Sequence, residues 1–306
     1  MKPKIINLAV LVLLLAACSS NDLNEVENQV EGDKVPVKVH VNEFSISVSG
    51  FDDFVAGARV GTRAEDAQSY ADVKACVLAF YDAAGNEVYK KTQNKADADT
   101  YTTFGDFKVD LQIGSYKMVA LGYNVGNNDE FALTSPTEAG YTSEKPREMF
   151  CYVQDVTVTK TEALDLDVTL DRIGAYLKIQ STDKRSAGVT KMRTTFSNGG
   201  KTFNPSTGLA LTNTGFSQTN NSSGGVGETI EINCFPYLFT DEQTMDVTIE
   251  ALDASDNVLF TKKITDVEFK RGYMTTIKGP IFTAGTSAVG FQLNTEWGEG
   301  KTYTFE

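Results

Sequence analysis

The sequence predicts an all-β protein built from β-sandwiches. Apolar and polar residues alternate in many short segments between residues 35 and 305, which is the pattern of half-buried strands. Gly, Asn, Asp and Pro separate these segments, and no long segment has a helical period. Short strands at this spacing are typical of a sandwich. At about 150 residues per domain, the 306 residues indicate two domains, each able to bury a core.

Residues 1–17 have the composition of a signal peptide. Lys2 and Lys4 precede an apolar run that ends at Ala17 and is shorter than the roughly 20 residues of a membrane span. Cys18 follows directly, and this order resembles the lipobox of bacterial lipoproteins. We therefore expect cleavage before Cys18 and attachment of membrane lipid to it. An ordinary secretory signal followed by a chance cysteine is the alternative.

Residues 18–34 are polar and acidic, and predict a flexible lipid-tethered linker. An N-terminal domain is expected over residues 35–169 and a C-terminal domain over 170–306. The first strand alternates with period two, but its apolar residues change phase near Glu43, which indicates a β-bulge there. These apolar residues are Val35, Val37, Val39, Val41, Phe44, Ile46 and Val48.

Strand signals continue along the chain, and loops are predicted over residues 49–69, 124–148 and 217–227. Residues 78–91 and 251–263 share an apolar strand, an Asp-Ala start, a turn with Asn and a final Lys-Lys. They predict the same hairpin in each half, with chance similarity as the alternative. The further strands are predicted over residues 73–81, 87–91, 107–111, 116–123, 152–159, 164–170, 175–179, 192–196, 230–234, 245–252, 258–264, 274–277, 291–293 and 303–305.

Composition excludes several classes of function. The net charge is −13, with 41 acidic and 28 basic residues, which argues against nucleic-acid binding because that requires clustered Lys and Arg. His40 is the only histidine, so a zinc site with several His ligands is impossible, and we expect it to face outward from its strand. Cys76, Cys151 and Cys234 are odd in number and widely spaced, which does not predict a disulfide framework and leaves one disulfide open.

Other candidate sites have simpler interpretations. Asp165 and Asp167 alternate with Leu and Val, as on the solvent face of a half-buried strand. Residues 197–202 contain Gly-Gly-Lys-Thr but lack the first glycine of a phosphate loop, so a turn is expected. We predict no catalytic residue, metal or cofactor, and an enzyme is the least expected class. Arg59 and Arg63 lie in a predicted loop, where proteolytic nicking concentrates.

Several motifs together resemble one family. The chain is similar to the fimbrillin-like lipoproteins of Bacteroidales bacteria, which are the pilins and anchors of type V pili. The residues that carry the resemblance, in order, are Thr62-Arg63-Ala64; Ala79-Phe80-Tyr81-Asp82 with Gly85; Gly114-Ser115-Tyr116; Leu170-Asp171-Arg172-Ile173-Gly174-Ala175; Phe269-Lys270-Arg271-Gly272-Tyr273-Met274-Thr275-Thr276 before Gly279-Pro280-Ile281-Phe282; and the segment around Trp297.

The resemblance implies two transthyretin-like β-sandwich domains in tandem and assembly by donor-strand addition. An arginine-specific protease would cut the outer-membrane precursor after Arg63, or secondly after Arg59, and strand 35–48 would leave. A strand from another pilus subunit would then fill the groove. The donor residues in this chain would be Phe291, Leu293, Trp297, Tyr303 and Phe305. The alternatives are an uncut, lipid-retaining anchor of the same family and a surface glycan-binding lipoprotein.

Overall fold

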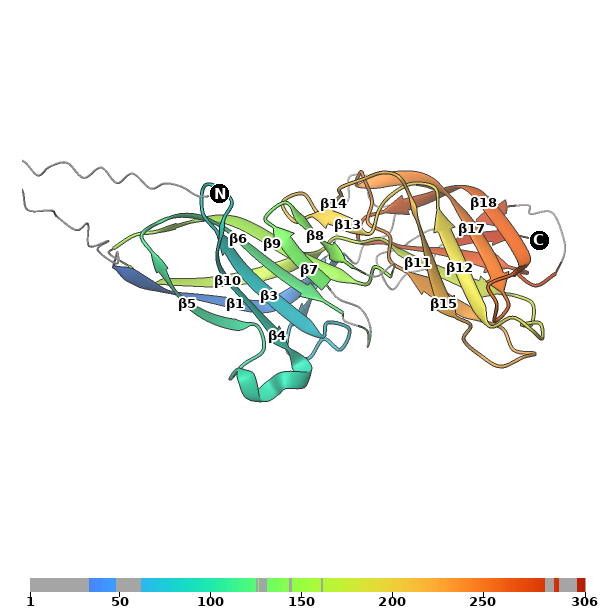
Figure 1. The fold of residues 1–306 in the computed structure, drawn as a ribbon, viewed down its shortest axis with the longest axis horizontal. Coiled ribbons are helices and arrows are strands. Elements are labelled where there is room, and N and C mark those ends of the chain that lie inside the picture. Colours follow the sequence, from blue (N-terminus) through green and yellow to red (C-terminus); the bar gives the residue numbers. More distant parts are fainter. Residues whose placement is uncertain are drawn as a thin grey trace, which may run out of the picture. The chain divides into compact units, whose positions relative to one another are not determined.

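The computed structural model is nearly all β, as the sequence predicts (Figure 1). It describes residues 33–47, 62–124, 126, 131–142, 145–160, 162–283, 289–291 and 302–305. The one helix in these ranges is a short 3-10 helix, η1 (Lys95–Thr100). No helix in the described ranges is long and apolar enough to cross a membrane. Asp33–Glu306 forms one compact unit, and the predicted signal peptide, Cys18 and most of the predicted linker lie outside the described residues.

The first strand is hydrogen-bonded along both of its edges. β1 (Lys34–Ser47) runs parallel to β10 (Leu164–Arg172). Its other edge pairs antiparallel with β5 (Asp106–Gln112) along the first half and with β2 (Thr62–Asp66) along the second. The register with β10 shifts between Val41 and Glu43, so the predicted β-bulge is confirmed.

A second group of strands packs against the β1 group. β9 (Met149–Val158), β6 (Gly114–Tyr123), β3 (Ala75–Tyr81) and β4 (Glu87–Asn94) pair antiparallel in that order. β10 joins β9 through two residue pairs at the strand ends. One apolar core, here called the first core, takes side chains from both groups. Its members include Phe44, Leu78, Phe80, Phe104, Phe107, Met118, Phe150 and Leu170.

β3 is buried at every position because its two faces meet different cores. Cys76, Leu78 and Phe80 belong to the first core, and the alternating residues from Ala75 to Tyr81 belong to another, here called the middle core. This explains why the sequence of this strand is a continuous apolar run rather than an alternating one.

Two further sheets share a third core, which is built from residues 175–282. In one sheet β11 (Tyr176–Ser181) lies between β16 (Glu231–Cys234) and β19 (Met274–Gly279), with β21 (Thr302–Phe305) and β20 (Val289–Phe291) beyond β19. The other sheet has the order β15 (Phe216–Asn221), β12 (Lys191–Phe196), β17 (Glu242–Leu252) and β18 (Val258–Lys270). β11 pairs in parallel with β19, as β1 does with β10.

A small sheet crosses the predicted domain boundary. β8 (Glu138–Tyr141) pairs with β7 (Phe131–Ser135) on one side and with β13 (Thr202–Asn204) on the other, and β14 (Leu209–Ala210) completes the sheet. The middle core likewise combines residues 75–151 with Ile173, Phe203, Ala210 and Tyr237. The division at residues 169 and 170, and the transthyretin-like type of each half, stay predictions.

Three predicted loops contain strands. β7 and β8 form a hairpin within residues 124–148, β15 occupies part of 217–227, and β2 lies at the end of 49–69. These strands are short, and β2 and β15 are mainly polar, so pairing with neighbours rather than a long alternation makes them strands. The Gly-Gly turn is confirmed, since residues 197–201 connect β12 to β13.

The predicted pair of hairpins is confirmed in atomic detail. Asp82 Oδ1 accepts hydrogen bonds from the backbone N–H of Ala84 (2.9 Å) and Asn86 (2.8 Å) at the β3–β4 turn. Asp253 Oδ1 accepts the same bonds from Ser255 (2.8 Å) and Asn257 (2.9 Å) at the β17–β18 turn. The side-chain amides of Asn86 and Asn257 donate to the other oxygen of each carboxylate (2.9 Å), and these bonds, followed by the backbone bonds, hold the pKa of both carboxyl groups below the usual range.

Candidate functional site: the first strand and its slot

β1 fills a slot whose floor is the first core. Val35, Val37, Val39, Val41 and Phe44 are all buried, with exposed fractions between 0% and 7%. They are five of the seven predicted apolar residues of the strand; the side chain of Ile46 and the whole of Val48 lie outside the described part. At about 1.5–3 kcal/mol for each buried side chain, β1 contributes on the order of 10 kcal/mol as an upper bound.

Phe44 anchors the second half of β1 in an aromatic cluster. Its ring centroid lies 4.8 Å from that of Phe150 and 5.7 Å from that of Tyr70. Gly122 on β6 leaves the space for this ring, because a Cβ there would lie 2.6 Å from Phe44 Cε1. Gly105 does the same for the backbone at the bulge, where a Cβ would lie 2.5 Å from the carbonyl oxygen of Val41.

A buried ion pair lies beside this cluster. Arg172 Nη2 is 2.5 Å from Glu148 Oε1, and the guanidinium carbon lies 5.2 Å from the centre of the Phe150 ring. The Tyr70 hydroxyl donates to Glu148 Oε1 (2.9 Å). Burial raises the pKa of the Glu148 carboxyl, while Arg172 and Tyr70 act in the opposite direction. Buried groups that are paired in this way hold the end of β10 in one arrangement beside β1.

The outer side of β1 is held by polar contacts. His40 Nδ1 donates to Asp106 Oδ1 on β5 (2.8 Å), and His40 Nε2 lies 2.9 Å from Asp165 Oδ1 on β10. Lys38 Nζ is 3.7 Å from Asp165 Oδ2, and Asn42 Nδ2 donates to Asp167 Oδ1 (2.6 Å). We call these contacts the polar ladder. His40 and the two β10 aspartates therefore face outward, as the sequence predicts; His40 contacts Asp165, and Asn42 contacts Asp167.

The predicted cleavage residues lie at the end of the slot or outside the described chain. Arg63 is the second residue of β2, where its backbone lies opposite Ile46 of β1. Arg59 falls outside the described residues. The bond after Arg63 is therefore part of a short ladder at the sheet edge, which must open before a protease can bind the segment.

The predicted donor residues lie partly on the C-terminal strands. Phe291 ends β20, and Tyr303 and Phe305 are on β21, which pairs in parallel with β19. Leu293 and Trp297 lie outside the described residues. The structure therefore places the candidate donor segment in the sheet of β11 and β19, and not beside β1.

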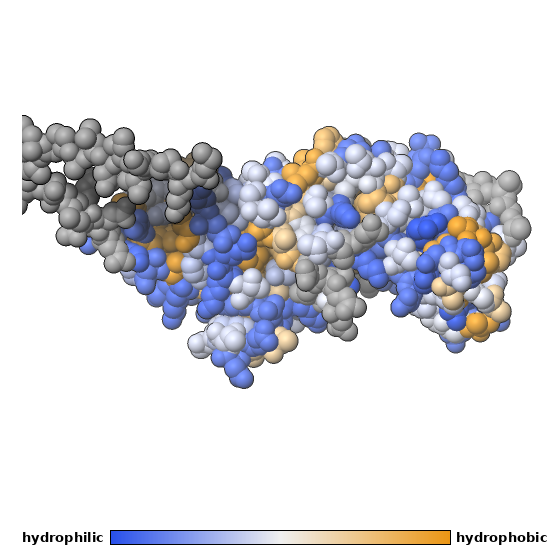
Figure 2. Space-filling view, in the orientation of Figure 1, coloured by the Kyte–Doolittle hydropathy of each residue, from blue (hydrophilic) through white to orange (hydrophobic). Residues whose placement is uncertain are grey.

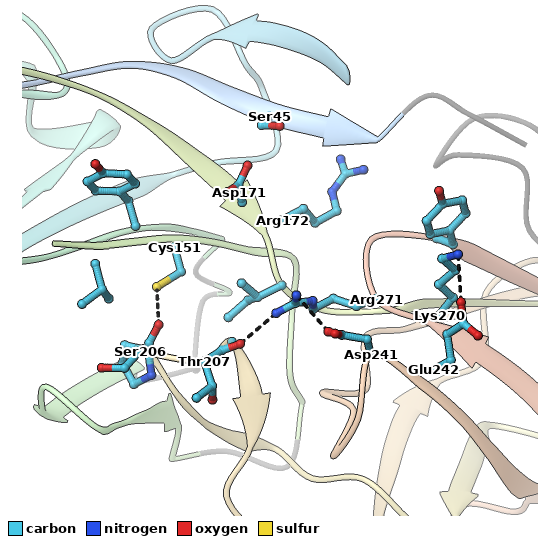
Figure 3. Close-up of a pocket in the computed structure, with 16 residues that line it drawn as sticks. Ser45, Cys151, Asp171, Arg172, Ser206, Thr207, Asp241, Glu242, Lys270 and Arg271 are labelled. Carbon is cyan, nitrogen blue, oxygen red and sulfur yellow. Dashed lines mark hydrogen bonds and ion pairs between the residues drawn. The ribbon is translucent and has the colours of Figure 1, made fainter. Parts of the chain in front are cut away.

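A cavity of about 840 Å³ lies next to the end of β1 (Figure 3). Ser45 of β1 and Asp171 of β10 line it, together with residues that follow β13, β16 and β18. Its charges pair with each other: Arg271 Nη2 lies 2.8 Å from Asp241 Oδ1, and Lys270 Nζ lies 2.9 Å from Glu242 Oε1. Mutual pairing of this kind favours a structural role for these charges.

The three cysteines of the described chain are free and buried, so none of them forms the disulfide that the sequence left possible. Cys151 Sγ donates to the backbone oxygen of Pro205 (3.3 Å) in the wall of the cavity. Burial raises the pKa of the Cys151 thiol, and raises those of Cys76 and Cys234 to about 12. Protonated thiols are poor nucleophiles, so these side chains act as small apolar groups.

The family of unknown function DUF6562 matches residues 36–304, which run from the start of β1 to β21. The chain belongs to this family. A comparison with curated proteins finds none that matches.

Several solved structures resemble this chain. A candidate adhesin from Bacteroides ovatus has 11% identity and a TM-score of 0.48, with 82% of this chain and 88% of that chain covered. The fimbrial anchor protein Mfa2 from Porphyromonas gingivalis has 9% identity and a TM-score of 0.44, with 76% and 83% covered. A fimbrial assembly protein from Parabacteroides distasonis has 12% identity and a TM-score of 0.37, with 84% and 94% covered. These are proteins of the kind that the motifs resemble, although at such TM-scores the likeness carries no argument about function.

The partners of β1 were not predicted from the sequence. Asp106, Gly122 and Glu148 are distant from β1 along the chain, and Glu148 lies in a predicted loop. A weaker signal was present, because Lys38 and His40 stand between valines in a chain with an acidic balance. Those two basic residues on one strand face indicate acidic neighbours.

Proposed function

We propose that the chain is a structural subunit of a cell-surface fimbria, with no enzymatic activity. It would be exported as an outer-membrane lipoprotein through Cys18, with two transthyretin-like sandwich domains in tandem. A protease would cut it after Arg63, and it would assemble with other pilus subunits by donor-strand addition. The observation that carries the proposal is the position of β1, which is hydrogen-bonded along both edges and buries its apolar face.

Loss of β1 would leave an opening that only another strand can fill. The edge of β10 and the edges of β5 and β2 would each present unpaired backbone groups, and the first core would be exposed between them. The stabilisation that β1 contributes, on the order of 10 kcal/mol, is comparable with the whole stability of a typical domain, about 5–15 kcal/mol. A cut subunit would therefore require a replacement strand, which combines backbone pairing with alternate side-chain pockets.

A second candidate is an uncut anchor that keeps both its lipid and β1. The observation in its favour is the ladder between β1 and β2, which holds the backbone of Arg63 opposite Ile46. The mature N-terminus of the surface protein separates the two candidates. A start at Ala64 supports the assembling subunit, whereas a lipidated Cys18 on all of the protein supports the anchor.

Substitution of Arg63 tests the cut site. We expect Arg63→Ala and Arg63→Lys to abolish processing by an arginine-specific protease and to prevent assembly, because Lys keeps the charge but not the specificity. Arg59→Ala is the matched control and should assemble normally. Electron microscopy of pili and N-terminal sequencing give the readout. Fimbriae of normal length in both Arg63 variants would exclude this cut site.

A further inference from the structure

The slot of β1 has an acidic rim in its first half. On β10, Asp165 lies opposite Lys38 and Asp167 lies opposite His40. On β5, Asp106 lies opposite His40 and Asp110 lies opposite Pro36. Both aspartates of β10 are exposed, and they alternate with residues that point into the first core.

β1 neutralises this rim with the residues between its valines. Lys38 and His40 contact Asp165, His40 also contacts Asp106, and Asn42 contacts Asp167. β5 also carries one basic residue at the rim, Lys108, which lies opposite Lys38. Without β1, four carboxylates and one ammonium group would border the opening with no partner from β1.

The C-terminal segment of this chain does not match the rim. Residues 289–306 contain one basic residue, Lys301, which is in phase with Tyr303 and Phe305 and would point with them toward the core. The positions that would face the rim carry no base and include two acids. They are Gly290, Gln292, Asn294, Glu296, Gly298, Gly300, Thr302, Thr304 and Glu306.

We propose that the slot selects a donor strand with cationic side chains at two alternate positions between its apolar residues, and so takes its donor from a different subunit rather than from a second copy of this chain. The inference rests on the proposed function, because it names the partner of the same slot. A neutral or acidic strand would leave the four carboxylates of the rim without a cation from the donor. The rim thus excludes wrong donors by repulsion as well as attracting the right one.

Peptide exchange into the full chain tests the proposal. A specific protease site placed within residues 49–61 allows the chain to be cut, and a fluorescent peptide of residues 34–47 then exchanges into the slot. One pair of competitors is the native peptide and its Lys38→Gln/His40→Gln version. The other pair is a peptide of residues 289–305 and its Gln292→Lys/Asn294→Lys version. We expect each neutral version to compete on the order of 10-fold less well than its cationic counterpart, since three charge-assisted contacts are lost.

Substitutions in the rim provide the reciprocal test. Asp106→Asn/Asp165→Asn in the protein should remove the preference for the cationic peptides. Asp155→Asn is the matched control, because Asp155 pairs with Lys117 on β6, away from the slot (2.6 Å between Nζ and Oδ1). The control should keep the preference.

The outcomes separate the two proposals. If the native peptide exchanges but the cationic and neutral competitors are equal, or if the unmodified C-terminal peptide competes as well as the native one, the charge rule is wrong and the proposed function stands. If the cut chain binds no peptide, including residues 34–47, the donor-strand function itself is wrong.

Discussion

At the scale of single residues, β1 is fitted to its slot by glycines and aromatic rings. Gly122 has no side chain where the Phe44 ring lies, and Phe150 and Tyr70 pack on the other sides of that ring. Interiors packed at this density tolerate added atoms poorly. Phe44 is thus the residue of β1 whose surroundings allow least change.

Gly122→Ala measures this fit. We expect a loss of about 1–3 kcal/mol in the free energy of unfolding, because the new methyl group overlaps the Phe44 ring. In a Phe44→Leu background, where the overlapping ring atom is absent, the same substitution should cost less. Denaturant unfolding of the four variants gives the coupling energy.

Gly85→Ala is the control for a glycine substitution without overlap. No atom lies within 4 Å of its Cβ position, but its φ of +84° costs about 1–2 kcal/mol for any other residue. That cost should be unchanged by Phe44→Leu. Equal costs of Gly122→Ala in both backgrounds would show that Phe44 does not fill the space beside Gly122.

At the scale of elements, β1 is held by different forces on its two sides. Its core side depends on apolar burial, which is insensitive to pH. Its outer side depends on the polar ladder, whose carboxylates come from β5 and β10. Between pH 5 and pH 8, the stability that the polar ladder contributes therefore varies with pH through His40. In the view of Figure 2, hydrophobic residues lie in separate patches among hydrophilic ones.

The polar ladder predicts that the stability of the protein depends on pH. The hydrogen bond to Asp106 is the largest cause that raises the pKa of His40 above 6.5, with Asp165 acting in the same direction against partial burial. Because the folded pKa is the higher one, the stabilisation is complete below the unfolded pKa of about 6.5. It is lost as pH rises through the folded pKa.

The measurement uses the single histidine of the chain. We expect its imidazole NMR signals to titrate with a midpoint above 6.5, and the stability difference between the wild type and His40→Gln to shrink from pH 5 to pH 8. A stability difference that stays constant over this range would show that the ladder does not hold β1.

At the scale of the whole described unit, the middle core connects the two halves of the sequence. Tyr237 is fully buried there, with its ring centroid 4.9 Å from that of Phe203 and its hydroxyl donating to the backbone oxygen of Arg147 (3.3 Å). The backbone of Tyr237 also exchanges two hydrogen bonds with Gly200. Residues 75–151 and 173–237 thus share one apolar cluster.

We expect the described unit to unfold in a single cooperative transition that depends on this cluster. Tyr237→Ala should cost about 3–5 kcal/mol and divide the calorimetric transition into two, because it removes the centre of the shared core. Phe196→Ala, which empties a buried site in the third core alone, should lower the transition temperature without dividing it. A wild-type protein with two resolved transitions would show that the halves are independent.

The sequence by itself determined the strand content, the first strand with its bulge, and the matching hairpins. Those features are local, because alternation with period two, a phase change at Glu43 and an Asp-Asn turn are each complete within a dozen residues. The export signal at Cys18 is equally local, and it stays a prediction.

Only the tertiary structure decided what surrounds β1. The parallel partner β10, the rim of Asp106 and Asp165, the space at Gly122 and the ion pair of Glu148 with Arg172 come from segments that are far from β1 in the sequence. Pairing between distant strands is set by the burial of whole faces, which a local pattern does not specify. The short strands β7, β8 and β15 were missed for the same reason, since pairing with their neighbours, and not a long alternation of their own, makes them strands.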